Sequence, residues 1–369
     1  MPAIAETNVQ NLLSLGWNGF FEAQVDREHD AELVPARVVE EQRGSYHIMG
    51  LGDAWRAELA GRLRHEMAGD WSAAPCAGDW VMARVPPLNA DGSPALIHRV
   101  LMRRTKFSRK EAGNRTAEQI IAANVDTIFL VQSLNHDLNP RRLERYLALL
   151  WESGAEPVVV LSKADLCPDP EPLVAVVRDS ARGVSVHVTS AVDAGGLEPL
   201  APYLVAGRTV ALVGSSGVGK STIVNRLLGQ DLMRVREIRE DDRGRHTTTS
   251  RHLVMLPGGG MLLDTPGMRT VLMWEGAEGL AHTFQNIEEI AARCKFRDCG
   301  HGSEPGCAVQ AALESGALDR GRFLNYRKVG REIIHEAKKT DVRLRMAENR
   351  RWRKIMLEQR RRPDKRKAR

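Results

Sequence analysis

The feature of this sequence that most limits its fold is the segment Gly214-Ser-Ser-Gly-Val-Gly-Lys-Ser221, which matches the pattern G-x-x-x-x-G-K-S/T. An apolar run, residues 210–213, precedes it, and a helix-like run, residues 222–228, follows it. Glycines at these places let backbone N–H groups converge on a phosphate, and the helix N-terminus adds a favourable dipole. We therefore predict a phosphate-binding loop, in which Lys220 neutralises β- and γ-phosphate oxygens and Ser221 ligates Mg²⁺. The predicted nucleotide-binding residues of this loop are Gly214, Ser215, Ser216, Gly217, Val218, Gly219, Lys220, Ser221 and Thr222.

A second candidate site follows the apolar run 260–263, which ends in Asp264-Thr-Pro-Gly267. An Asp at the tip of a strand can hold Mg²⁺ through water, and the Gly267 N–H can meet a γ-phosphate. The pattern D-x-x-G is weak when it stands alone. Downstream of a phosphate loop, it predicts that Asp264 and Gly267 belong to the same nucleotide site.

The polar residues 241–249 lie between these two motifs. One threonine among residues 247–249 is expected to close on Mg²⁺ and the γ-phosphate. Met268 follows the D-x-x-G motif and cannot orient an attacking water, so intrinsic hydrolysis is expected to be slow. His246 is the nearest substitute for a water-orienting residue, although a solvated loop histidine is the alternative interpretation.

A third polar strand end, Ser162-Lys163-Ala-Asp165, indicates the base of the nucleotide. The Asp165 carboxylate can accept hydrogen bonds from N1–H and the 2-amino group of guanine, and adenine has no such donor pair. Lys163 would lay its stem across the base. The set predicts GTP rather than ATP and disfavours the alternative of a P-loop kinase or ATPase. Backbone N–H groups facing the guanine O6 are expected from Thr189, Ser190 and Ala191.

Buried-looking strands alternate with helix-like segments from residue 120 to about residue 272, which predicts a parallel sheet covered on both faces. Lys163 and Asp165 precede the phosphate loop, whereas in ordinary GTPases the base-reading motif comes last. Because the pocket depends on the spatial order of the strands, this permuted order can assemble the same site. The strands are expected at residues 127–131, 157–161, 185–188, 209–213 and 260–264.

Short segments with period-2 alternation, separated by glycine-containing turns, fill residues 33–104 and predict a five-strand, OB-fold-like barrel. Its aromatic residues are expected to fill the interior for the most part, with stacking on RNA bases as the alternative. These residues are Tyr46, Trp55, Trp71 and Trp80.

Three cysteines and one histidine cluster as Cys294-x₄-Cys299-x-His301-x₅-Cys307. Three thiolates and one imidazole make a closed tetrahedral zinc set with no position left for substrate water, so we predict a structural zinc ion. Buried cysteines without a ligand are the alternative. Five cysteines in 369 residues cannot form a disulfide framework, which favours a reducing, cytoplasmic location.

The formal charge of +6 is unevenly distributed along the chain. Residues 341–369 hold 13 Lys and Arg against four Asp and Glu, a charge of +9, so the other 340 residues carry −3. This segment is predicted to bind RNA, with a solvated, disordered end as the alternative for residues 360–369. A helix is expected over residues 322–357, with Phe323, Tyr326, Ile333 and Ile334 facing inward. The apolar runs are too short to span a membrane, and the first residues lack a secretory signal.

Together, the motifs K-A-D, T-S-A, G-S-S-G-V-G-K-S-T, G-R-H-T-T-T, D-T-P-G and C-x₄-C-x-H-x₅-C behind a barrel closely resemble the ribosome small-subunit-dependent GTPase A family. The resemblance implies a circularly permuted GTPase that binds the small ribosomal subunit late in its assembly, is stimulated by it, and leaves after hydrolysis. By the same resemblance Thr248 looks like the switch threonine, a Mg²⁺ ligand, and His246 like the catalytic histidine. Ser162 departs from the family's usual asparagine, which puts the tightness of guanine binding in doubt.

The expected fold is therefore multidomain: an all-β barrel, an α/β permuted P-loop GTPase domain, and a zinc-binding helical module. Expected cofactors are one Zn²⁺ and Mg²⁺ with GTP or GDP; expected partners are the small subunit and its rRNA, with the chain a monomer. A nucleotide-gated RNA-binding protein with incidental hydrolysis is the alternative function. The expected parts are an extension (1–32), the barrel (33–104), a linker (105–119), the GTPase domain (120–280), the zinc module (281–340) and a basic tail (341–369).

Overall fold

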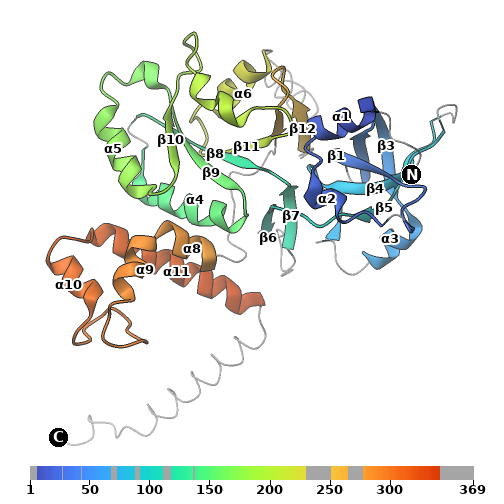
Figure 1. Cartoon of the computed structure of the whole chain (residues 1–369). Helices are drawn as coiled ribbons and strands as arrows, with labels where there is room; N and C mark the ends of the chain where they lie inside the picture. Colours follow the sequence, from blue (N-terminus) through green and yellow to red (C-terminus); the bar gives the residue numbers. More distant parts are fainter. Residues whose placement is uncertain are drawn as a thin grey trace, which may run out of the picture.

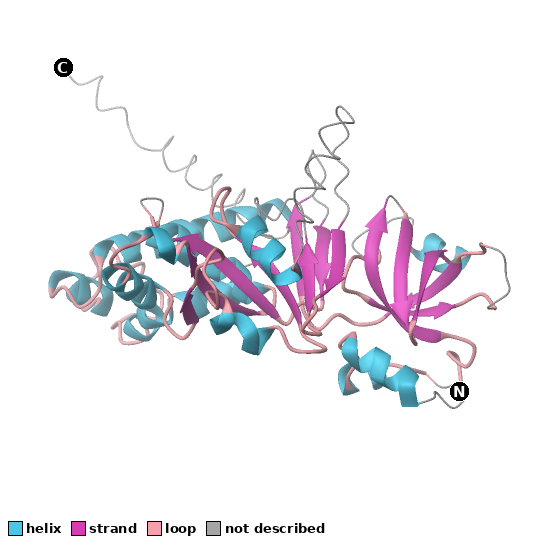
Figure 2. Ribbon diagram, turned by 90° about the horizontal axis from the view of Figure 1, so that it is seen from above, coloured by secondary structure: helices cyan, strands magenta, loops and turns pink. Residues whose placement is uncertain are grey.

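In the computed structural model of the chain, one continuous sheet runs through two domains, in the order β10-β9-β8-β11-β13-β12-β1-β2-β3-β5-β4 (Figure 1). Figure 2 shows barrel strands at one end of the molecule and a helical module at the other. Among the described residues, no helix is long and apolar enough to cross a membrane. The structure describes residues 6–26, 28–42, 44–67, 73–87, 92–110, 118–135, 138–229, 251–264 and 277–340.

The α/β half of the sheet is parallel, as predicted from its continuous apolar runs. Every residue of its central strand, β8 (Thr127–Ser133), is buried. Helices α4 (Pro140–Glu152) and α5 (Glu171–Ser180) cover one face. Helix α6 (Lys220–Leu228) and the 3₁₀ segment η3 (Glu198–Tyr203) cover the other. The remaining parallel strands are β9 (Glu156–Ser162), β10 (Ser185–Val188), β11 (Thr209–Val213) and β13 (Met261–Asp264).

An additional strand, β12 (Arg251–Met255), joins the α/β domain to the barrel and was not predicted. It runs antiparallel to β13 and also antiparallel to the first barrel strand, with Glu40 opposite His252. The Glu40 carboxylate lies 3.4 Å from His252 Nε2 and 2.9 Å from His47 Nδ1. The barrel is therefore hydrogen-bonded to the sheet that carries the phosphate loop, rather than tethered by a flexible linker.

The predicted five-strand barrel is confirmed, and β1–β4 pairing closes it. Its interior holds small and branched apolar side chains together with the buried Tyr46. Trp55 is only partly buried against this core, and Trp71 lies outside the described residues. Helix α3 (Gly61–Glu66) follows the third strand. The strands are β1 (Val34–Gln42), β2 (Ser45–Gly50), β3 (Asp53–Leu59), β4 (Trp80–Arg84) and β5 (Ala95–Val100).

Trp80 corrects one expectation, because it lies on the outer face of the barrel. Its ring is fully buried and contacts Trp17 and Phe21, at centroid distances of 4.8 and 5.8 Å. Phe21 belongs to helix α2 (Gly19–Glu22), and Trp17 lies between α2 and the preceding helix α1 (Glu6–Ser14). Residues 12–21 thus cover the barrel and share one core with the α/β domain.

Residues 105–119, expected to be a linker, contribute to a two-stranded sheet instead. Strand β6 (Lys106–Lys110) pairs antiparallel with β7 (Glu118–Ala123). Phe107 and Ile121 are each only 2% exposed and belong to the core that joins the barrel to the α/β domain. The polar residues of 105–119 concealed this pairing, whereas the apolar residues 120–123 of β7 are buried on both faces.

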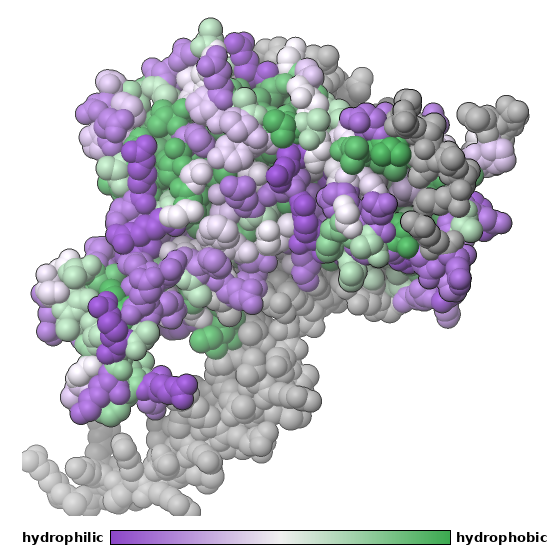
Figure 3. Space-filling view, viewed as in Figure 1, coloured by the Kyte–Doolittle hydropathy of each residue, from purple (hydrophilic) through white to green (hydrophobic). Residues whose placement is uncertain are grey.

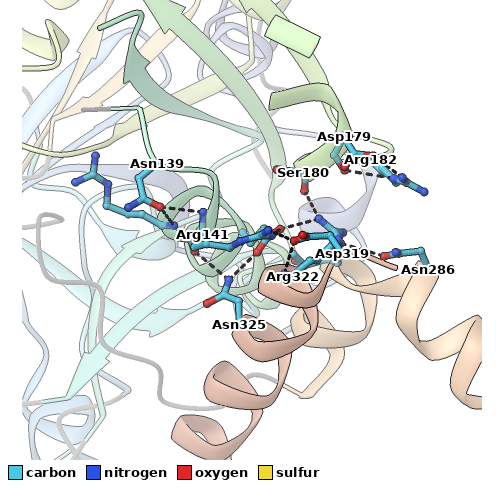
Figure 4. A network of polar contacts seen from close by, with 12 residues as sticks. Asn139, Arg141, Asp179, Ser180, Arg182, Asn286, Asp319, Arg322 and Asn325 are labelled. Carbon is cyan, nitrogen blue, oxygen red and sulfur yellow. Dashed lines mark hydrogen bonds and ion pairs between the residues drawn. The ribbon is translucent and has the colours of Figure 1, made fainter. Parts of the chain in front are cut away.

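The C-terminal module docks on α4 through a buried ion pair (Figure 4). The Arg322 guanidinium donates to Glu144 Oε1 at 2.8 Å and to the backbone oxygens of Thr283 and Ser180 at 2.8 and 3.2 Å. Glu144 also accepts from Asn325, at 2.7 Å. Burial is the largest influence on both charges: it raises the pKa of Glu144 and lowers that of Arg322. The helices are α8 (Ala277–Thr283), α9 (Gln285–Ala291), α10 (Ala308–Glu314) and α11 (Arg320–Thr340).

Replacing Arg322 by methionine is expected to lower the free energy of unfolding by about 3 kcal/mol, because Glu144 would lose its buried counter-charge. The double variant Arg322→Met/Glu144→Gln should recover part of this loss, since no unpaired charge then remains. Denaturant unfolding checks both values, with Lys328→Met on the exposed face of α11 as the matched control. A double variant no more stable than the single one would show that the ion pair is not the cause.

Candidate functional site

The predicted phosphate loop has the backbone that its glycines require. Gly219 has φ +94° and immediately precedes α6, and Gly217 has φ +79°. A Cβ on Gly214 would lie 2.4 Å from the Val131 carbonyl oxygen, so only glycine fits beside β8. The loop thus leaves β11 tightly against its neighbouring strand and turns into the N-terminus of a helix.

Lys220 is the first residue of α6 and folds back over the loop. Its Nζ donates to the carbonyl oxygens of Gly214 and Ser215, at 2.7 and 2.6 Å. Ser221 and Thr222 follow it in the first turn of the helix, and both are exposed or partly exposed there. The loop therefore places a cation and a hydroxyl side by side at a helix N-terminus, where an anion is favoured.

The end of β9 is bound directly to this loop. The Ser162 hydroxyl lies 2.6 Å from the Val218 carbonyl oxygen and 3.2 Å from that of Gln132. Lys163 has a left-handed backbone, φ 60°, and its Nζ donates to Gly217 O at 2.6 Å. A link between Ser162 and the loop was not predicted, and it shows that this residue connects the two candidate motifs.

The last candidate base-reading residues meet next to this strand end. Ser190 Oγ donates to Asp165 Oδ1 at 2.9 Å, and the Ala164 N–H donates to Thr189 O at 3.1 Å. Sequence reasoning missed Gly196, where a Cβ would lie 2.1 Å from Ser190 O. The signal that could have indicated it is the Gly-Gly pair of residues 195 and 196. Ala191 follows Ser190 and is half-buried.

The candidate motifs thus meet at one edge of the sheet. Strands β9, β10, β11 and β13 belong to one parallel set, so their carboxyl ends lie on the same side, where open α/β sheets bind ligands. Strand β13 ends there at Asp264. The other predicted residues of this edge lie outside the described residues: His246, Thr248 and Gly267.

The Cys/His cluster forms a compact set of four donor atoms, which lie within 4.8 Å of one another. Cys294 Sγ is 3.9 Å from Cys307 Sγ and 3.6 Å from His301 Nδ1. Two thiolates on a tetrahedral zinc ion are about 3.8 Å apart, because each Zn–S bond is about 2.3 Å. Cys299 supplies the fourth donor. The predicted residues therefore fit a metal ion in both number and spacing.

The local backbone around His301 supports a site at this place. His301 has φ 54°, which is costly for a residue with a side chain. Its carbonyl oxygen accepts from Gln310 Nε2 at 2.6 Å, and its ring packs edge-on against Phe323, with 6.4 Å between centroids. Cys307 caps α10 by accepting from the Gln310 N–H. The cluster thus joins two helices of the module.

Comparison with known proteins agrees with this geometry. A family model for the RsgA GTPase matches residues 100–274. A small ribosomal subunit biogenesis GTPase RsgA from Opitutus terrae is 45% identical over 356 residues, which cover 95% of this chain and 97% of that protein. The protein of the same name from Streptomyces avermitilis is 43% identical, over 96% of this chain and 94% of its own length.

Solved structures show the same architecture. The crystal structure of YjeQ from Thermotoga maritima matches with a TM-score of 0.62 and 25% identity, covering 82% of this chain and 99% of that one. The structure of YloQ, a circularly permuted GTPase, shares the fold with a TM-score of 0.58 over 84% of this chain and 98% of that one, at 23% identity. The permuted motif order, the geometry at the sheet edge and these relatives lead to one conclusion: the chain belongs to the RsgA GTPase family.

Proposed function

We propose that this chain acts on the small ribosomal subunit late in its assembly, that the subunit stimulates its hydrolysis of GTP to GDP and phosphate, and that hydrolysis is coupled to release. The relatives named for small-subunit biogenesis support the substrate, because they match this chain over nearly its whole length. One observation carries the nucleotide assignment. The Lys163-x-Asp165 strand end is hydrogen-bonded to the phosphate loop, so base and phosphate sites are adjacent.

In the nucleotide complex, loop N–H groups and Lys220 bind the phosphates, and Asp165 reads guanine while the Lys163 stem covers it. Ser190 already orients the Asp165 carboxylate through its hydroxyl. Mg²⁺ supplies charge at the β- and γ-phosphates, held by Ser221, Asp264 and Thr248. His246 orients the attacking water in place of a glutamine, and Gly267 contacts the γ-phosphate.

The Cys₃His set holds one structural zinc ion. The four donors would fill every position of a tetrahedral ion, which would organise the module and leave no site for substrate. The proposed parts keep the predicted boundaries, except that residues 105–119 contribute to the β6–β7 sheet instead of forming a linker. The barrel and the basic residues 341–369 contact rRNA. A cytoplasmic monomer suits a reduced Cys₃His site and a ribosomal partner.

Replacing Ser162 by alanine is expected to weaken GTP and GDP binding about tenfold. The Val218 carbonyl would lose its buried partner, which costs about 1–3 kcal/mol. Equilibrium binding of a fluorescent guanine nucleotide measures the change. Ser133→Ala is the matched control, because Ser133 pairs with Ser162 across the sheet but donates to Asn135. Equal affinities of the two variants would remove Ser162 from the site.

Turnover of GTP and ATP, with and without purified small ribosomal subunits, tests the proposed function. Slow GTP hydrolysis that rises strongly with small subunits is expected, with little turnover of ATP. Large subunits serve as the control partner. Equal ATP turnover would contradict the guanine assignment, and a GTP rate that small subunits do not change would contradict the ribosomal one.

A further inference from the structure

An exposed phenylalanine lies within the candidate metal site. Phe296 belongs to the loop Cys294-Lys-Phe-Arg-Asp-Cys299 and is 43% exposed. Five of the seven phenylalanines in the chain are at most 3% exposed. Phe20 is 40% exposed but packs edge-on against Phe21, with 5.1 Å between ring centroids. The Phe296 ring is therefore open to a partner outside the chain.

The backbone presents this ring on a short, fixed loop. The Cys299 N–H donates to Phe296 O at 3.3 Å, and the Lys295 N–H donates to Gly306 O at 3.2 Å. Cys294 and Cys299, at the two ends of the loop, both belong to the four-donor cluster. The residues between α9 and α10 project from the module on the side away from the α/β sheet (Figure 1). A partner can therefore reach the ring without moving another domain.

Positive charge surrounds the ring. Arg293, Lys295 and Arg297 are all exposed, and Asp298 is the single acid among residues 293–298. Lys295 Nζ lies 5.5 Å from the centroid of the Phe296 ring. The nearby Glu304 carboxylate accepts from the N–H groups of Gly300 and Gly302, at 3.1 and 2.7 Å, so backbone donors already engage it. Figure 3 shows strongly hydrophilic residues beside hydrophobic ones over this module.

We propose that Phe296 is a stacking platform for an unpaired base of RNA, and that Arg293, Lys295 and Arg297 bind the phosphates on either side of that base. Proteins recognise single-stranded RNA by stacking splayed bases on aromatic rings within a basic surface, and this loop supplies both elements. A protein partner would match a larger apolar patch, whereas a single ring among cations matches a nucleotide. The site rests on the proposed ribosomal function and adds to it a specific contact in the metal-binding module.

Sedimentation of the full-length protein with purified small ribosomal subunits tests the site. Phe296→Ala is expected to weaken binding about tenfold, the loss typical of removing one base–aromatic stack. Phe296→Trp should bind as tightly as the unchanged chain, and Phe296→Leu should resemble the alanine variant because leucine has no π face. Replacing Lys295 and Arg297 by alanine should flatten the dependence of affinity on salt. Phe20→Ala is the matched control, since it removes an equally exposed ring from another domain.

Metal content and thermal unfolding of each variant establish that the loop is intact. Equal binding by Phe296→Leu and the unchanged chain would overturn the stacking site, and so would unchanged binding by Phe296→Ala. A photoreactive benzoylphenylalanine at position 296 should form adducts with rRNA; adducts with ribosomal proteins alone would also overturn the proposal. If the unchanged chain fails to bind small subunits at all, the ribosomal function fails. If the unchanged chain binds small subunits and the Phe296 variants bind them equally well, the ribosomal function stands without this site.

Discussion

Replacing Lys220 by alanine is expected to reduce subunit-stimulated GTP hydrolysis at least about 100-fold at saturating GTP, as removal of one preorganised charge at a reacting centre typically does. Lys220 Nζ contacts two carbonyl oxygens of its own loop, so the ammonium is held over the loop that we propose to bind the phosphates. Without the Lys220 ammonium, the negative charge that develops in the transition state of γ-phosphoryl transfer is less stabilised. Single-turnover and steady-state rates measure the effect.

Lys163→Ala is the matched control for this prediction. Its Nζ also donates to the loop, at Gly217 O, but its stem is assigned to the base rather than to the phosphates. The Lys163 variant should raise KM and leave kcat within a few-fold of the original value, whereas the Lys220 variant should lower kcat. A Lys220→Ala protein that hydrolyses GTP at the original rate would remove the loop from the chemistry.

The parts of this architecture that could be predicted depend on local pattern. Glycine spacing predicts the phosphate loop. Runs of apolar or alternating residues predict the five parallel strands and the barrel strands. Local pattern does not predict strand β12, because its five residues follow a polar segment and one of its two pairing partners, β1, lies far away in the chain. The connection between the barrel and the α/β sheet therefore depends on non-local strand pairing, which local sequence patterns do not predict.

The sequence also did not predict on which face of an element some side chains lie. In β4, Val81 and Ala83 face the barrel interior, whereas Trp80 and Met82 face the N-terminal helices. An alternating pattern cannot reveal which face of a strand is interior when both faces are covered. In α11, Phe323 and Ile333 are buried as expected, but Ile334 is 55% exposed because it lies one position beyond the buried stripe.

Ser162 shows that a departure from a motif can have a structural role that the sequence does not indicate. From the sequence alone, serine in place of asparagine suggests a weaker base site. In the structure, its hydroxyl lies 2.6 Å from the Val218 carbonyl oxygen and joins the end of β9 to the phosphate loop. A short side chain suffices because the strand and the loop approach closely here: a Cβ on Gly219 would lie 3.7 Å from Ser162 Oγ.

Removing the metal from the Cys₃His cluster is expected to unfold the C-terminal module while the α/β sheet stays folded. The module's own core is small; it contains Phe284, Ile287, Cys307, Val309, Leu318 and Phe323. Zinc binding contributes about 10–16 kcal/mol of apparent free energy in small zinc modules, more than such a core supplies. The main core of the sheet is separate from this cluster and should be unaffected.

Cys307→Ser is the sharpest form of this experiment, because it removes a metal donor while the serine hydroxyl can still accept from the Gln310 N–H at the start of α10. Elemental analysis should find one zinc per chain before the substitution and little after it. Hydrogen exchange should then lose protection over residues 284–323, including the Arg322 contact with α4, and keep it in β8 and β11. Cys167→Ser, at a thiol outside the cluster, should change neither zinc content nor exchange. A zinc-free Cys307→Ser protein with unchanged protection would show that packing alone holds the module, and that the four donors do not form a structural metal site.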